Sequence, residues 1–227
     1  MNSRNWKLSP SDFAFLWEEC KRCFYLKVVH NFARPRPIMP KIFNIIDSQM
    51  KSFYADKRTE DIVKNMPPGI IKYGEKWVES KPVHLPRKSS SCYIRGKFDT
   101  IVYFDDGTYG VIDFKTSERK SEHIPLYDRQ LHAYAHALEN PAAGKLSLSP
   151  ISKLGLLVYE PNSYSQTDDG NALLMGALSW IEIPRRDSRF KKFLSEVVSV
   201  LQMPEPPGGA PSCEWCQYRD TSRRTKL

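Results

Sequence analysis

The chain has 227 residues, a length that suits one globular domain with a substantial core. Its formal net charge of +8 favours a polyanionic partner such as DNA or RNA. The sequence has no apolar run of about eighteen residues, which excludes a transmembrane helix, and residues 1–12 lack the apolar centre of a signal peptide. We therefore expect a cytoplasmic protein without a membrane partner.

The first part of the domain, about residues 9–66, is predicted to be helical. A helix-start signal, Ser9-Pro10-Ser11-Asp12, precedes a stretch with helical apolar spacing over residues 13–29. Pro35 and Pro40 interrupt the chain, and residues 42–54 form a second amphipathic pattern. We expect two helices here.

The central part, about residues 70–203, is predicted to hold the sheet. Strand patterns cover residues 77–85, 93–102 and 110–116, and Asp105-Asp106-Gly107 between the last two is a hairpin turn signal. A helix over 126–138, strands over 153–159 and 177–183, and a helix over 190–202 follow. The order indicates an α/β fold with helices flanking a sheet. Residues 204–227 form a C-terminal segment with a basic tail.

Two acids and a lysine stand out on the neighbouring strands. Asp99 lies in the strand over 93–102, and Asp113 and Lys115 lie in the next one. Residues i and i+2 of a strand point to the same face, so Asp113 and Lys115 project together. Converging carboxylates suit Mg²⁺ or Mn²⁺, and a lysine beside the metal can orient a water or steady developing charge. The set suits phosphodiester hydrolysis; the alternative is a group of solvated ion pairs.

The pattern extends over three ordered segments. A G-x-x-D strand at residues 96–99, a D-x-K-T strand at 113–116 and a Q-x-x-x-Y helix at 130–134 follow one another. This ordered triple resembles the PD-(D/E)xK nuclease superfamily, and within it the RecB-like branch, which includes CRISPR-associated RecB-like exonucleases and the nuclease domains of recombination helicases. The resemblance implies a restriction-endonuclease-like αβββαβ core with a mixed central sheet.

The resemblance also implies a metal site. Asp99, Asp113 and the backbone carbonyl of Phe114 would hold Mg²⁺ or Mn²⁺. This branch often adds a histidine from an early helix, and residues 42–54 contain none. Asp47 is the best substitute, because a carboxylate oxygen also suits these ions. The alternative for Asp47 is a solvated position on a polar helix face.

Five cysteines argue against a complete disulfide framework. Cys20 and Cys23 form one C-x-x-C pair, and Cys213 and Cys216 form another near the other end of the chain. Two such pairs suit four thiolates around Zn²⁺ or an iron–sulfur cluster, which would join the N- and C-terminal segments. Cys92 stands alone and is expected to be a small buried hydrophobe.

The resemblance bears on the choice of metal. RecB-like exonucleases with a [4Fe–4S] cluster take one cysteine from an N-terminal helix, matched here by Cys20, and three from a C-terminal segment. Cys213 and Cys216 match the first two of these three. Ser222 stands near the third position, and Cys23 could take its place as a ligand. The resemblance therefore favours an iron–sulfur cluster, and the alternatives are zinc and a site without metal.

These features together predict a metal-dependent DNA nuclease, either an exonuclease or an enzyme that processes ends or flaps. The expected partner is DNA that is single-stranded or has free ends. Lys115 would orient or activate the water, and the resemblance implies that Gln130 and Tyr134 line the cleft. One alternative is a catalytically inactive, nuclease-like DNA-binding module within a larger repair, recombination or defence complex. Another is a structural adaptor built around the cysteines.

Overall fold

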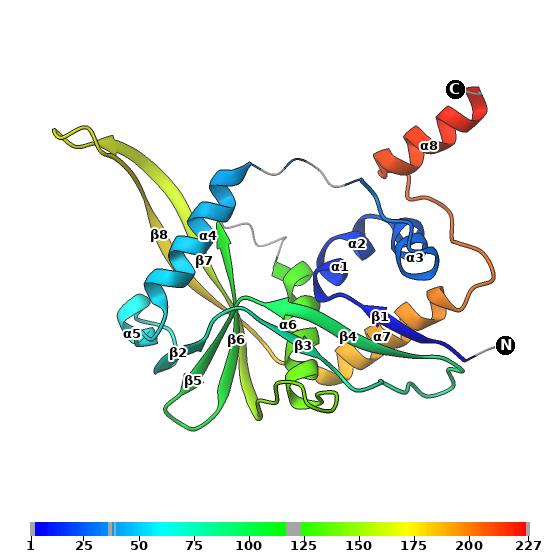
Figure 1. The fold of residues 1–227 in the computed structure, drawn as a ribbon, viewed down its shortest axis with the longest axis horizontal. Helices are drawn as coiled ribbons and strands as arrows, with labels where there is room; N and C mark the ends of the chain where they lie inside the picture. The colour runs from blue at the N-terminus through cyan, green and yellow to red at the C-terminus, as the bar shows by residue number, and fades with distance from the viewer. Residues whose placement is uncertain (1–2, 36–37, 39, 117–123, 226–227) are drawn as a thin grey trace.

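The computed structural model describes residues 3–35, 38, 40–116 and 124–225, which form two sheets and flanking helices (Figure 1). The larger sheet has the strand order β2-β5-β6-β7-β8, and its strands are β2 Gly69–Tyr73, β5 Thr100–Phe104, β6 Tyr109–Thr116, β7 Ile151–Gln166 and β8 Ala172–Ile183. The smaller sheet has the order β1-β4-β3, with β1 Asn5–Leu8, β3 Lys76–Glu79 and β4 Ser91–Phe98. The helices are α1 Pro10–Ala14, α2 Leu16–Glu19, α3 Lys21–His30, α4 Lys41–Tyr54, α5 Thr59–Ile62, α6 Ile124–Glu139, α7 Asp187–Leu201 and α8 Glu214–Thr225.

The larger sheet is mixed and carries a helix on each face. β6 pairs with β5 antiparallel and with β7 parallel. Val111 of β6 belongs to the core cluster that includes Leu131 of α6, whereas Ile112 and Phe114 belong to the cluster beside Met50 of α4. Alternate residues of β6 therefore face α6 and α4, as the pleat of a strand requires.

When the short helix α5 and the two intervening strands of the smaller sheet, β3 and β4, are set aside, the chain runs α4, β2, β5, β6, α6, β7, which is a helix, three strands, a helix and a strand. This confirms the predicted α/β architecture with a mixed sheet flanked by helices.

The strand predicted over residues 93–102 is in fact two strands in different sheets. β4 ends at Phe98 and pairs with β1 and β3, while β5 begins at Thr100 and pairs with β2 and β6. Asp99 is the residue between them. The predicted strand over 77–85 is also shorter, because its continuous pairing with β4 covers only Lys76–Glu79, and Val83 adds a single isolated bridge to Cys92. The sequence pattern missed β1, which brings residues 5–8 into the smaller sheet.

The helices and the last hairpin also differ from expectation. The helix predicted over 13–29 is divided into α1, α2 and α3, and Cys20 takes an extended backbone conformation between α2 and α3. The strands predicted over 153–159 and 177–183 extend into the long β7–β8 hairpin, which projects as an arm in Figure 1. The basic tail is helical as far as Thr225, in α8.

Among the described residues, none of the helices has both the length and the apolar character that a membrane crossing needs.

Candidate active site and four-cysteine centre

The break between β4 and β5 places Asp99 beside β6. The antiparallel register pairs Thr100 with Ile112, so Asp99 comes next to the segment that holds Asp113. The Phe114 backbone N–H donates to Asp99 Oδ2 at 3.2 Å. The N–H and C=O of one strand residue point to the same edge, so the Phe114 carbonyl also faces Asp99. Asp99 thus lies against the open edge of β6, where strand pairing has ended.

Asp113, which is buried, and Lys115, which is half-buried, form an ion pair on the face of β6 that is turned toward α6. Asp113 is only 3% exposed, and this burial raises the pKa of its carboxyl to about 7, although the Lys115 charge opposes the rise. Burial also disfavours the charged form of Lys115, but the Asp113 charge outweighs it and the pKa of the ammonium is raised. Lys115 therefore keeps its positive charge at neutral pH. As predicted, the side chains of Asp113 and Lys115 project from the same face of β6.

Helix α6 covers this pair with two further side chains. Gln130 Nε2 donates to Asp113 Oδ1 at 3.4 Å, and the Lys115 ammonium lies 4.8 Å from the centre of the Tyr127 ring. Asp113 Oδ2 is buried and faces the Lys115 ammonium, whereas Gln130 Oε1 is a buried oxygen without a hydrogen-bond partner among the described residues. A buried acceptor without a donor is costly, and a bound cation would satisfy it. The donor set is oxygen, which fits Mg²⁺ or Mn²⁺.

Tyr134 has a structural position beneath β4. Its side chain is buried, and its hydroxyl donates to the Lys97 carbonyl at 2.7 Å. Gly96 lies directly above, where an added Cβ would come 2.7 Å from Pro10 Cδ and 3.1 Å from Tyr134 Cε1. Gly96 of the G-x-x-D motif and Tyr134 of the Q-x-x-x-Y motif therefore pack α6 closely against β4 just before Asp99.

A second group of charges surrounds Asp99 on the α4 side. Lys51 Nζ lies 3.0 Å from Asp99 Oδ1, 2.7 Å from Asp47 Oδ2 and 2.8 Å from Glu75 Oε1. Asp47 and Asp99 thus face one ammonium. The sequence analysis missed Lys51 and Glu75. The i,i+4 spacing of Asp47 and Lys51 could have predicted that Lys51 lies beside Asp47 on one helix face.

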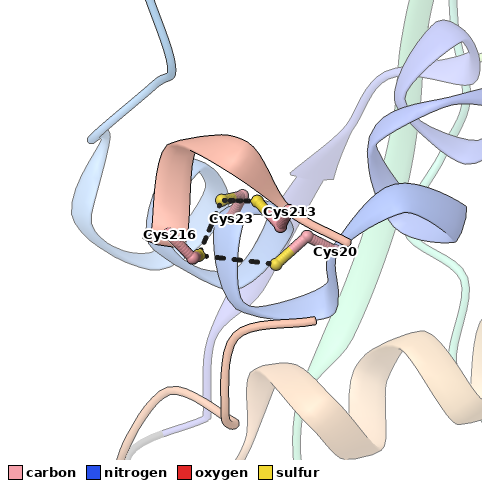
Figure 2. A group of neighbouring side chains, drawn as sticks. All are labelled: Cys20, Cys23, Cys213 and Cys216. Atoms are coloured by element: carbon pink, nitrogen blue, oxygen red, sulfur yellow. Dashed lines mark hydrogen bonds between the residues drawn. The ribbon is translucent and has the colours of Figure 1, made fainter. Parts of the chain in front are cut away.

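The four paired cysteines come together between α3 and α8 (Figure 2). Their sulfur atoms all lie within 4.8 Å of one another, and all four residues are buried. Cys23 Sγ is 3.7 Å from Cys213 Sγ and 3.5 Å from Cys216 Sγ, and Cys20 Sγ is 3.7 Å from Cys216 Sγ. The predicted juxtaposition of the two chain ends is confirmed. Cys92 lies in the main core cluster, where burial raises the pKa of its thiol to about 12.

Two arginines donate to sulfur atoms of this centre. Arg34 Nη2 is 3.1 Å from Cys213 Sγ, and Arg219 Nη2 is 4.0 Å from Cys216 Sγ. Burial opposes ionisation of Cys20, but backbone hydrogen bonds from Ala210 and Cys23 outweigh it and lower the pKa of the Cys20 thiol to about 6. Burial raises the pKa of the Cys23 and Cys216 thiols. The two guanidinium groups favour the thiolate form, which is the form that binds metals.

The family model of the PD-(D/E)XK nuclease superfamily matches residues 47–221, which is more than half of the chain. The matched range contains the residues around Asp99 and Asp113 and the C-terminal cysteine pair. The solved structure titled "Crystal structure of SSO0001" aligns with 100% of this chain and 89% of its own at 18% identity, with a TM-score of 0.45. No curated protein matches the chain.

Proposed function

The chain belongs to the PD-(D/E)XK nuclease superfamily, and from that premise we propose that it is a metal-dependent DNA nuclease of the RecB-like type. The observation that carries the proposal is the meeting of Asp99, Asp113 and Lys115 at the open edge of β6. Nucleases of this superfamily use divalent metals, and the oxygen atoms gathered here are the ligands that Mg²⁺ and Mn²⁺ prefer.

The carboxylates of Asp99 and Asp113 and the Phe114 carbonyl would hold the metal, with Asp47 as a further ligand from α4. A divalent cation at these oxygens supplies Lewis-acid stabilisation of the negative charge that develops on the phosphate. Gln130 holds the Asp113 carboxylate through its amide hydrogen bond and excludes water from the buried side of the site.

Lys115 acts as a charged hydrogen-bond donor. Its raised pKa keeps the ammonium protonated, so it orients the attacking water and stabilises charge on the phosphate, and another group receives the proton of the water. Tyr134 positions the site through β4, since its hydroxyl is already bonded to the Lys97 carbonyl.

We propose that the substrate is DNA that is single-stranded or has a free end. Labelled linear and circular single-stranded DNA, each incubated with Mg²⁺ or Mn²⁺ and with a chelator, test this proposal. We expect cleavage of the linear strand that the chelator abolishes, and little cleavage of the circle. Equal cleavage of the circle would contradict an exonuclease, and absence of cleavage on linear, flap and duplex substrates with either ion would contradict a nuclease.

The second candidate is a catalytically inactive DNA-binding module. It is favoured by Lys51, whose ammonium neutralises Asp99 and Asp47 without any metal, and by the lack of a histidine in α4. DNA binding without cleavage under all the conditions above would support this candidate.

We propose zinc as the occupant of the cysteine centre. Tetrahedral zinc with sulfur at about 2.3 Å places its ligand sulfurs about 3.8 Å apart. Three of the separations here, between 3.5 and 3.7 Å, are close to that value. A four-iron cluster is larger than a single ion and needs its cysteine sulfurs farther apart. The alternative, a [4Fe–4S] cluster, is tested by the metal analysis described below.

A further inference from the structure

A cavity of about 360 Å³ lies between the segment that follows α3 and helix α8, beside the cysteine centre. Pockets of roughly 300–1,000 Å³ are typical of small-ligand sites. Three aromatic and three basic residues line it: Phe32, Arg34, Trp215, Tyr218, Arg219 and Arg223. None of them belongs to the site at Asp99 and Asp113.

The aromatic side chains around this cavity are unusually open to solvent. Phe32 is 59% exposed, Trp215 is 42% exposed and Tyr218 is 77% exposed. Rings that are this exposed add little to a core, and three of them around one hollow leave their faces free for another flat group. Stacking of a nucleic-acid base on such a ring is tolerant of sequence because every base has a π face.

The arginines give the cavity a positive rim. Arg34 is paired with Glu19, and Arg219 lies 3.5 Å from Asp220, so these two are anchored near the cysteines. Arg223 has no acidic partner within the part of the chain that the structure describes. A guanidinium that has no acidic partner among the described residues is suited to a phosphate, which it can bind through two hydrogen bonds.

The β7–β8 arm is an exposed apolar surface that lacks the basic residues of the cavity. The β7–β8 arm also exposes apolar residues, including Tyr164 at 73% exposure. Residues 154–184 contain no lysine, arginine or histidine, and the arm carries Glu160, Asp168 and Asp169. The arm therefore repels a polyanion, whereas the α8 cavity attracts one.

We propose that the cavity lined by Phe32, Trp215, Tyr218 and Arg223 is a second nucleic-acid site, which binds one unpaired base by stacking and the adjoining phosphate by the arginine. This inference rests on the proposed function, since it assigns the site to the same DNA strand. Because the cysteines join α8 to α3, the metal centre would hold together the two segments that line this cavity.

The test is fluorescence anisotropy of a labelled single-stranded oligothymidine with the full chain, in an Asp113→Asn background that prevents cleavage. Tyr218→Ala should weaken binding about tenfold, because stacking on one ring contributes roughly 1–3 kcal/mol per base. Tyr218→Trp should restore it. Tyr164→Ala, a change at a tyrosine of similar exposure on the arm, is the matched control and should leave the affinity unchanged. Arg223→Gln should reduce the slope of log affinity against log salt by about one.

Metal content and melting temperature are measured for each variant, and both should match the parent because Tyr218 and Arg223 are exposed. Equal affinities for Tyr218→Ala and Tyr164→Ala in a parent that binds DNA would overturn the cavity proposal and leave the nuclease proposal intact. A parent that binds no oligonucleotide at low salt would overturn both proposals.

Discussion

Lys51 Nζ lies 3.0 Å from Asp99 Oδ1, so an ammonium from α4 faces a carboxylate that we propose as a metal ligand. The Lys51 side chain is only 13% exposed. Burial opposes its charge, but hydrogen bonds to Asp47 and Glu75 outweigh this effect and raise its pKa. Lys51 therefore stays charged and competes with a divalent cation for the same carboxylates.

Lys51→Gln should tighten Mn²⁺ binding about tenfold, which corresponds to about 1.4 kcal/mol. The reason is that the substitution removes the competing cation and leaves Asp47 and Asp99 facing each other. Isothermal titration calorimetry with Mn²⁺ measures the effect, and Lys41→Gln at the start of the same helix is the control. Unchanged or weaker Mn²⁺ binding in Lys51→Gln would show that the lysine does not compete with the metal.

The raised pKa of Asp113 predicts a pH dependence of metal binding. A carboxyl with a pKa of about 7 is protonated below that pH, and the proton competes with the cation. Mn²⁺ affinity should be about tenfold weaker at about pH 6 than well above pH 7, since each pH unit below the pKa costs a factor of about ten. The folded metal-free protein holds this proton more tightly than the unfolded chain does, so its stability should fall as pH rises from about 4 toward 7.

Mn²⁺ titrations across this range test the pH prediction directly. Asp113→Asn removes the titrating group, and its residual Mn²⁺ affinity should depend much less on pH. A wild-type affinity that is constant between about pH 6 and 8 would contradict the protonation of Asp113 in the metal-free site.

Gly96→Ala should destabilise the protein by about 1–3 kcal/mol, the usual range for overpacking a core. Its Cβ would come 2.7 Å from Pro10 Cδ and would press on Tyr134. Gly74→Ala is the matched control, because no atom lies within 4 Å of its Cβ position. Thermal unfolding of both variants measures the difference, and equal melting temperatures would refute the packing role of Gly96.

The cysteine centre should release α8 when its metal is removed. Purified protein is expected to hold about one zinc per chain and to be colourless; brown protein that absorbs near about 400 nm would indicate the iron–sulfur alternative instead. Chelation should lower the melting temperature and open residues 204–211 to proteolysis. Cys216→Ser should reproduce this loss and Cys92→Ala should retain the metal, because Cys92 lies apart from the cluster. Folded protein with no metal and free thiols would contradict the centre.

The sequence allowed prediction of the α/β architecture and of the meeting of the four cysteines. Both follow from local signals: alternating strand patterns, a hairpin turn, and paired C-x-x-C spacings. The joint projection of Asp113 and Lys115 follows from the two-residue period of a strand.

The parts that could not be predicted depend on long-range pairing. Residues 93–102 have a continuous strand pattern, and only the partners on each side divide them at Asp99, because β1 and β3 pair with one half and β2 and β6 with the other. Lys51 and Asp99 are 48 positions apart in the sequence, and they come into contact only because α4 packs on the sheet. Helix α8 has few apolar residues, and the cysteines and the ion pair of Arg22 with Asp220 hold it in place.

The most direct test of the proposed activity compares metal-dependent cleavage by wild-type protein, Asp113→Asn and Lys115→Met. The account predicts that each substitution lowers the rate at least about a hundredfold while most of the DNA affinity remains, because these side chains serve the metal and the developing charge. Asp106→Asn, an acid at the far turn of the same hairpin, should cleave like the wild type. Cleavage at the wild-type rate by both Asp113→Asn and Lys115→Met would contradict the account.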